Sequence, residues 1–169
     1  MNGAGLYGCS GLERRVTVFD TAGARGWRFT HGGPPDDSFI DNMIVGSGID
    51  LVEISRIQHS LDRFGSRFLD RVYTPKEQAY CLRKRNAAES LAARFAAKEA
   101  GAKALGTGIS RGVNWLEIEV IREPGGRPAL RFHGRAAEVA RRLGAHRSAL
   151  SITHTAALAM ASVVLEDGR

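Results

Sequence analysis

Two carboxylates and one lysine have the types and spacing that a metal-assisted phosphoryl transfer requires. Asp50 follows a Gly-Ser-Gly segment, whose glycines let the backbone approach another group closely. Glu99 and Lys103 follow about fifty residues later and lie four positions apart, so both project from one side of a helix. Carboxylates are suitable ligands for Mg²⁺ near phosphate oxygens. The three side chains therefore predict metal-assisted phosphoryl-type transfer.

Each of these residues also has an ordinary structural explanation. Asp50 could cap a helix or stabilise a turn. Glu99 and Lys103 could be an exposed helix pair that contributes roughly a few tenths of a kcal/mol. Alanines surround this pair in the sequence, and a carboxylate that faces such small residues instead of solvent would favour the functional interpretation. The residues by themselves leave both explanations open.

Two further groups of polar residues are candidates for binding anions. Residues 151–155 place hydroxyls and the imidazole of His154 at the mouth of a predicted hairpin, where they suit phosphate or ribose contacts. A polar turn is the alternative. Arginines also recur at spacings of seven and four along a predicted helix, where they would meet an acidic helix or a phosphate backbone. They are Arg56, Arg63, Arg67 and Arg71, and a solvated face balanced by Asp62 and Asp70 is the alternative.

The elements that must position these residues begin at Met43, the first residue of a buried strand predicted at 43–46. Hydrophobic periodicity and capping signals predict the other elements. The predicted helices are 55–73, one that starts at Pro75 after an N-capping Thr74, 87–105 and 135–143, and the predicted strands are 116–120, 129–132, 148–153 and 157–165. These elements do not alternate with βαβ spacing, so the predicted class is α+β.

Residues 1–42 differ in composition from the rest of the chain. They are rich in glycine and lack sustained periodicity, so we expect a flexible extension with candidate short strands at 16–19 and 27–29. Met43 is a hypothetical natural start. The extension has four arginines and five acidic residues, so its net charge is −1. Because the whole chain has a net charge of +6, residues 43–169 carry +7. We interpret 43–169 as one domain.

The basic composition narrows the choice of partner without settling it. A net charge of +6 and a pI near 9.9 indicate either an anionic partner or a solvated basic surface. Nucleic acid is disfavoured, because aromatic residues make up only 7% and zinc, RNP and helix-turn-helix patterns are missing. Cys9 and Cys81 are too few for a disulfide framework or a zinc site. With no bilayer-length apolar run or signal segment, we expect a cytoplasmic protein without a membrane partner.

Three segments resemble the signatures of the bacterial holo-acyl-carrier-protein synthases, a family of phosphopantetheinyl transferases. They are GSGIDLVEI at 46–54, ARFAAKEAGAKALGTG at 93–108 and SITHT at 151–155, in the order and spacing of the family. The second segment is highly specific and the other two support it. The resemblance spans about 43–166, and residues 1–42 have no counterpart. Gly101 departs from the family pattern and should loosen its helix by up to about 1 kcal/mol relative to alanine.

The resemblance implies an activity and an assembly. The activity is Mg²⁺-dependent transfer of 4′-phosphopantetheine from coenzyme A to a serine hydroxyl of apo acyl carrier protein, with release of adenosine 3′,5′-bisphosphate. The implied fold is a long helix packed on a small antiparallel sheet, in a homotrimer whose active sites lie at subunit interfaces. The alternative is a non-catalytic module that binds carrier protein or nucleic acid. Retention of Asp50, Glu99 and Lys103 together argues against a module that has lost catalysis.

The resemblance also assigns roles to individual residues. Asp50 and Glu99 would be the magnesium ligands, and Glu99 would act either as the base for the serine hydroxyl or as a ligand only. Lys103 would lie beside the transferring phosphate of coenzyme A. The nucleotide end of coenzyme A would contact Arg94, His154 and Thr155. The acidic helix of the carrier protein would contact Arg56, Arg63 and Arg67.

Overall fold

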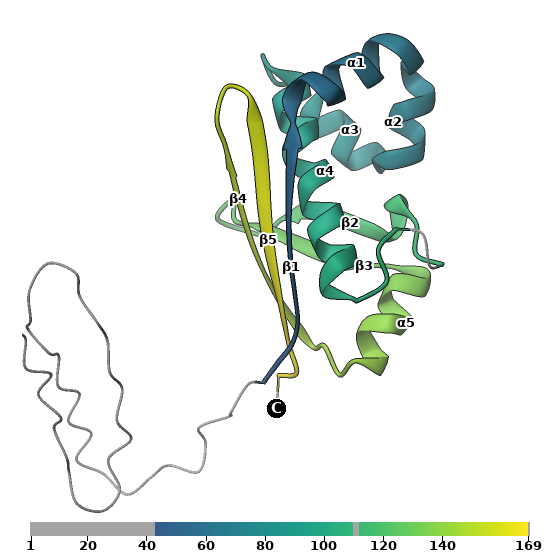
Figure 1. Cartoon of the computed structure of the whole chain (residues 1–169), viewed down its shortest axis with the longest axis vertical. Coiled ribbons are helices and arrows are strands. Elements are labelled where there is room, and N and C mark those ends of the chain that lie inside the picture. Colours follow the sequence, from purple (N-terminus) through teal and green to yellow (C-terminus); the bar gives the residue numbers. More distant parts are fainter. Residues whose placement is uncertain (1–42, 110–111, 169) are drawn as a thin grey trace, which may run out of the picture. The chain divides into compact units, whose positions relative to one another are not determined.

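The structure is a computed structural model that describes residues 43–109 and 112–168 (Figure 1). The predicted extension 1–42, with its candidate strands and Cys9, lies outside the described residues. In chain order the elements are β1 (Ile44–Glu53), α1 (Ile54–Phe64), α2 (Ser66–Val72), α3 (Pro75–Cys81), α4 (Ala87–Ala104), the 3₁₀ turn η1 (Trp115–Glu117), β2 (Ile118–Arg122), β3 (Pro128–Phe132), α5 (Gly134–Arg142), β4 (Arg147–His154) and β5 (Leu158–Glu166).

One antiparallel sheet and one long helix form the centre of the fold. The sheet has the order β1-β5-β4, and β2 and β3 form a separate two-stranded sheet. Along β5 the buried side chains alternate with partly exposed ones, as expected for a strand with one covered face. The buried set is Ala159, Ala161, Val163 and Leu165. The predicted α+β class, with a long helix on a small antiparallel sheet, is confirmed.

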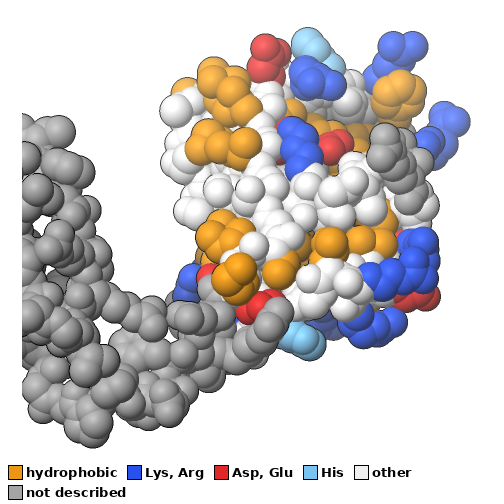
Figure 2. Space-filling model, turned by 60° about the horizontal axis from the view of Figure 1, so that its bottom comes forward, with side chains coloured by type: hydrophobic (Ala, Val, Ile, Leu, Met, Phe, Trp, Pro, Cys, Tyr) orange, Lys and Arg blue, Asp and Glu red, His pale blue; other side chains and the backbone are white. Residues whose placement is uncertain are grey.

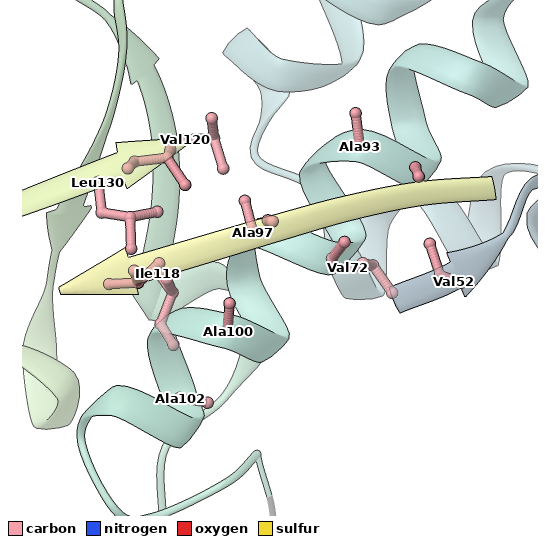
Figure 3. Packing of buried hydrophobic residues seen from close by; sticks show 14 of the residues in the cluster. Val52, Val72, Ala93, Ala97, Ala100, Ala102, Ile118, Val120 and Leu130 are labelled. Atoms are coloured by element: carbon pink, nitrogen blue, oxygen red, sulfur yellow. The ribbon is translucent and has the colours of Figure 1, made fainter. Parts of the chain in front are cut away.

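Helix α4 is buried around most of its circumference because it lies between the main sheet and the β2–β3 hairpin (Figures 1 and 3). Its contact residues are mostly alanines, which are good helix formers and let both layers approach the helix closely. Figure 3 shows Ala93, Ala97, Ala100 and Ala102 of α4 among Val52, Val72, Ile118, Val120 and Leu130. Apolar side chains from other elements therefore surround this helix.

The contact between α4 and β1 is a backbone contact. A Cβ atom added to Gly46 would lie 2.2 Å from the carbonyl oxygen of Ala104, and one added to Gly48 would lie 2.1 Å from that of Ala100. Real Cβ atoms do not approach so closely, so only glycine fits at these two positions. Because side chains alternate along a strand, Asp50 shares the helix-facing side of β1 with both glycines.

Three local expectations were wrong. The helix predicted at 55–73 is two helices. Gly65 adopts φ 53° and ψ −128°, which interrupts the helical hydrogen-bond pattern between α1 and α2. Leu116 lies in η1 rather than in a strand. The first strand, predicted to be buried, continues to Glu53 and has only Val52 buried, so Asp50 lies inside it and not after it. The capping box predicted at Thr74 is confirmed: its hydroxyl accepts from the backbone N–H of Glu77.

None of the helices in the described part of the chain is both long enough and apolar enough to span a bilayer.

We expect Gly48→Ala to lower the free energy of unfolding by roughly 1–3 kcal/mol, the usual range for overpacking a core. The added methyl group would meet the main chain of α4, which cannot move aside as a flexible side chain can. Ser47→Ala, on the opposite face of the same strand, is the control and should change stability by less than about 0.5 kcal/mol. Urea unfolding at equal protein concentration measures both, and a Gly48→Ala variant as stable as the wild type would contradict the contact.

Candidate active site

Asp50 and Lys103 form an ion pair across the contact between β1 and α4. Lys103 Nζ lies 2.8 Å from Asp50 Oδ1 and also donates to the carbonyl oxygen of Ile49 at 3.0 Å. The side chain of Asp50 is 15% exposed and that of Lys103 is 49% exposed, so the pair lies at the protein surface. Asp50 caps no helix, because it pairs with Ala161 of β5 in the middle of the strand.

Glu99 completes this cluster from the preceding turn of α4. Its side chain is partly buried, and burial raises its pKa. The negative charge of Asp50 raises the pKa of Glu99 further, and the positive charge of Lys103 partly opposes the shift. Asp50 thus lies close enough to interact with Glu99. The structure therefore brings together all three residues that the sequence predicted to carry the chemistry.

The donor set of the cluster fits a magnesium ion better than a metal enclosed by protein. Nowhere in residues 43–109 and 112–168 do three or more His, Cys, Asp or Glu side chains gather as a metal cage. Magnesium usually takes one or two carboxylates and completes its coordination with waters and substrate phosphates. Two neighbouring carboxylates at a partly open surface have that composition.

A basic pocket of about 540 Å³ lies on another side of α4. Arg94 and His154, both predicted to bind the nucleotide, line it. The other lining residues are Tyr80, Lys84, Arg85, Asn86, Glu89, Ser90, Ala93, Val120, Arg122, Gly126, Pro128 and Ile152. They come from the end of α3, the start of α4, the β2–β3 hairpin and β4. The pocket therefore gathers four basic side chains and one imidazole from segments that are distant in the sequence.

The ring of Tyr80 organises the cations of this pocket. The guanidinium of Arg94 lies 4.2 Å from the ring centroid, and the ammonium of Lys84 lies 4.7 Å from it. Arg122 donates to the Tyr80 hydroxyl. Burial raises the pKa of Tyr80, but hydrogen bonds from Arg122 and Lys84 outweigh it and hold this pKa below its ordinary value. The ring thus holds three cations that would otherwise repel one another.

Arg94 is almost fully buried, with 8% of its surface exposed. Its Nη1 donates to the Ser90 hydroxyl at 3.2 Å. Its Nε is buried and has no hydrogen-bond partner among the residues that the structure describes. A buried guanidinium with an unused donor is costly, and an anion at this pocket would lower that cost through its charge.

Sequence reasoning missed Tyr80, Lys84, Arg85 and Arg122. One signal was visible, because residues 83–85 form a basic run between two predicted helices. Arg122 and Tyr80 gave no signal, because they reach the pocket from different elements.

His154 and Thr155 differ in their surroundings. His154 Nδ1 lies 3.5 Å from Glu89 Oε1 at the edge of the pocket. The Thr155 hydroxyl accepts from the backbone N–H groups of Ala157 and Leu158 at 3.3 and 3.1 Å, which shapes the turn between β4 and β5. Thr155 is not among the described residues that line the pocket, and its contact with the nucleotide stays a prediction.

The cluster and the pocket lie on different sides of α4. Arg94 and Glu99 are five positions apart, which separates them by about 140° around a helix. Asp50 lies on β1 and His154 on β4, the two edge strands of the main sheet. Within one chain, α4 and β5 therefore separate the basic pocket from the cluster of Asp50, Glu99 and Lys103.

The predicted arginine stripe is divided between two helices. Arg56 and Arg63 lie on α1, and Arg67 lies on α2 beyond the break at Gly65. All three are exposed. The acidic residues expected to balance them accept hydrogen bonds from glutamines instead: Asp62 from Gln58 at 2.8 Å and Asp70 from Gln78 at 3.1 Å. The arginines thus remain available to an acidic partner.

Comparison with known proteins identifies the family. The model of the 4′-phosphopantetheinyl transferase superfamily matches residues 46–161. The chain belongs to this superfamily. The match includes the metal-ligand candidates, the basic pocket and the exposed arginines.

Several relatives of the chain are holo-[acyl-carrier-protein] synthases. The one from Koribacter versatilis is 60% identical over 125 residues, which are 74% of this chain and all of that protein. The Helicobacter pylori enzyme, solved in complex with coenzyme A, is 34% identical with a TM-score of 0.63 and covers 70% of this chain and 98% of that one. The Bacillus anthracis enzyme, also solved in complex with coenzyme A (3′,5′-ADP), is 40% identical with a TM-score of 0.61. The match covers 73% of this chain and 97% of that one.

Proposed function

We propose that this protein is a holo-acyl-carrier-protein synthase, which transfers 4′-phosphopantetheine from coenzyme A to a serine hydroxyl of apo acyl carrier protein. The observation that carries the proposal is the convergence of Asp50, Glu99 and Lys103, which come from two separate signatures of the family. Relatives with this name match the chain over their whole length. Since coenzyme A and carrier proteins are substrates inside the cell, we propose the cytoplasm as its compartment.

The chemistry is an in-line displacement at phosphorus. The serine oxygen of the carrier forms a bond to the phosphorus that bears the pantetheine arm. The bond from that phosphorus to the bridging oxygen breaks, and adenosine 3′,5′-bisphosphate leaves with the electron pair. Glu99 is the proposed acceptor of the hydroxyl proton. Lys103 offsets the charge that develops on the leaving group.

Asp50 and Glu99 are the proposed ligands of Mg²⁺. When bound, the ion would neutralise the diphosphate and help to align it for attack. Lys103 now supplies the positive charge beside Asp50, at 2.8 Å, and its half-exposed side chain can turn toward the substrate phosphate. The nucleophile belongs to the carrier protein, which explains why the enzyme needs no activated serine or cysteine of its own.

The basic pocket is the proposed site for the nucleotide end of coenzyme A. Adenosine 3′,5′-bisphosphate carries two phosphate groups, and the pocket offers Lys84, Arg85, Arg94 and Arg122 to them. We assign direct contacts to Arg94 and His154, and Thr155 stays an expected contact at the neighbouring turn. The solved structures of two relatives with coenzyme A support a site of this kind in the family.

We propose that the enzyme is a homotrimer in which two subunits build each active site. The outer face of the main sheet exposes Ile49 and Leu51, which are 55% and 56% accessible, and Leu51 pairs with Met160 of β5. An apolar sheet face of this kind needs cover, and other copies of the chain can provide it. The division of the site across α4 supports the same arrangement, because the pocket of one subunit could face Asp50 and Glu99 of the next.

The proposed docking site for the acidic helix of the carrier is the surface with Arg56, Arg63 and Arg67. Figure 2 shows Lys and Arg side chains on one face of the described part, most of them toward its border, with fewer Asp and Glu side chains. Residues 43–169 carry +7. Such a surplus accelerates encounter with an acidic protein and acts less strongly at high salt.

We expect apo acyl carrier protein to gain the mass of one phosphopantetheine when incubated with this protein, coenzyme A and Mg²⁺, and to gain none with EDTA. Asp50→Ala and Glu99→Ala should each lower turnover by at least about a hundredfold while folding normally, because each removes a metal ligand. Glu53→Ala, an exposed carboxylate on the same strand as Asp50, is the control. Intact-mass spectrometry follows the reaction. A folded protein that modifies no carrier would favour the binding-module alternative.

We expect inactive subunits of two kinds to complement each other. Coexpressed Asp50→Ala and Arg94→Gln chains should regain activity at about a quarter of their sites, the fraction given by random mixing around a closed ring. Neither variant alone should show this activity. Sedimentation velocity of the mixture checks for a trimer. Activity that never exceeds that of the separate variants would place each site within a single chain.

We expect Arg56→Glu to raise the KM for carrier protein by about tenfold or more, and to leave the KM for coenzyme A nearly unchanged. The charge reversal adds repulsion toward an acidic helix but lies outside the nucleotide pocket. Arg135→Glu on α5, which is also exposed, is the matched control. Steady-state kinetics with each substrate varied in turn measures the effect. Equal damage to both KM values would show that the docking surface lies elsewhere.

A further inference from the structure

An ion pair lies fully inside the protein, below the nucleotide pocket. Lys98 Nζ and Glu77 Oε2 are 2.8 Å apart, and their side chains are 0% and 1% exposed. Burial lowers the pKa of Lys98, although the charge of Glu77 opposes this shift. A buried pair is stable only when its other donors and acceptors are also satisfied.

The remaining hydrogen bonds of the pair join four elements. Glu77 Oε2 accepts from the backbone N–H of Thr74 at 2.8 Å, which closes the N-terminus of α3. Glu77 Oε1 accepts from the backbone N–H of Val120 on β2 at 3.0 Å. Lys98 Nζ, from α4, donates to the carbonyl oxygen of Trp115 in η1 at 2.9 Å. The pair thus fixes α3, α4, β2 and η1 relative to one another through directional contacts.

On three of these elements, a residue of the pocket wall that belongs to the cluster around the Tyr80 ring lies close to the point where the pair holds the element. Tyr80 lies three residues after Glu77 on α3, and Arg94 lies four residues before Lys98 on α4. Arg122 lies two residues after Val120, on the same face of β2. These three side chains meet at the Tyr80 ring, through the stacked Arg94 and the hydrogen-bonded Arg122.

We propose that the buried Glu77–Lys98 pair positions the nucleotide pocket: it sets the placement of α3, α4 and β2 that brings Tyr80, Arg94 and Arg122 together for coenzyme A. This inference rests on the proposed function, because it assigns the pocket to that substrate. Glu77 and Lys98 are positioning residues, since neither lies at the reacting phosphate.

The ionic character of the pair supports this role over simple stabilisation. Apolar side chains of similar volume are often as stable as a buried ion pair, or more stable. They impose no direction on their neighbours, whereas each contact of Glu77 and Lys98 requires a defined position of a main-chain group. A packed apolar replacement should therefore keep the fold but lose the alignment of the pocket.

The test is the double variant Glu77→Gln with Lys98→Met, which removes both charges and nearly keeps the volume. We expect the unfolding temperature of the double variant to be close to that of the wild type. Lys98→Met alone should unfold at a lower temperature, because it leaves the charge of Glu77 buried without its cation. We also expect the KM of the double variant for coenzyme A to rise about tenfold or more, with kcat at saturating coenzyme A within about twofold of the wild type. A purely structural pair would let KM recover together with stability.

The matched control is the exposed pair of Arg135 and Glu138, in which Nη1 and Oε2 are 2.9 Å apart. Arg135→Met with Glu138→Gln should leave the KM for coenzyme A unchanged. Glu77→Gln alone, which keeps a hydrogen-bond acceptor, provides the same kinetic test if the double variant does not fold. A folded variant with the wild-type KM overturns the inference.

The wild-type protein distinguishes a failure of the proposed function from a failure of this inference. If it modifies no carrier protein, calorimetric titration with coenzyme A replaces KM as the measurement. Weaker binding by the double variant then still supports the positioning role. Equal binding by both proteins, or no binding by the wild type, overturns it.

Discussion

The close backbone contact between β1 and α4 is the constraint on which the rest of the structure depends. Gly46 and Gly48 leave no side chain between the strand and the helix, and alanines on α4 keep the approach short. Asp50 is the next residue on the same face of β1, so the contact that packs the core also brings it to Lys103 and Glu99. A larger residue at Gly48 would separate a strand that carries one carboxylate from a helix that carries the other.

The same closeness creates an electrostatic imbalance that suits a dication. Asp50 and Glu99 bring two carboxylates to the single ammonium of Lys103. Burial raises the pKa of Glu99, and the charge of Asp50 raises it further. Fixed charges that await a ligand are costly to the folded protein but need little reorganisation when the ligand binds. The nucleotide pocket shows the opposite imbalance, with several cations gathered on one aromatic ring. A magnesium ion would reduce the imbalance at the carboxylates, and substrate phosphates would reduce the imbalance in the pocket.

Much of this site could be predicted because its key residues lie in local sequence signatures. Asp50, Glu99 and Lys103 were found from residue types and spacing, and the capping box at Thr74 from its pattern. The break at Gly65 was missed because apolar residues keep helical spacing across it. The capping pattern included Glu77, but nothing in the sequence indicated that Glu77 pairs with Lys98 in the interior, because charged residues are rarely buried. The pocket around Tyr80 depends on residues from several elements, and only the tertiary structure brings them together.

The arrangement of α4 gives a physical reason for the proposed sharing of each active site between subunits. One helix carries Glu99 and Lys103 on one side and Arg94 on another, and a single helix cannot turn both sides toward one ligand. A neighbouring copy can supply the missing side, and a closed ring gives every subunit both roles. The apolar outer face of the sheet, with Ile49 and Leu51, then has a purpose that the monomer does not explain. Assembly would bury this surface and complete the active site in the same step, so that the unassembled chain would be inactive as well as less stable.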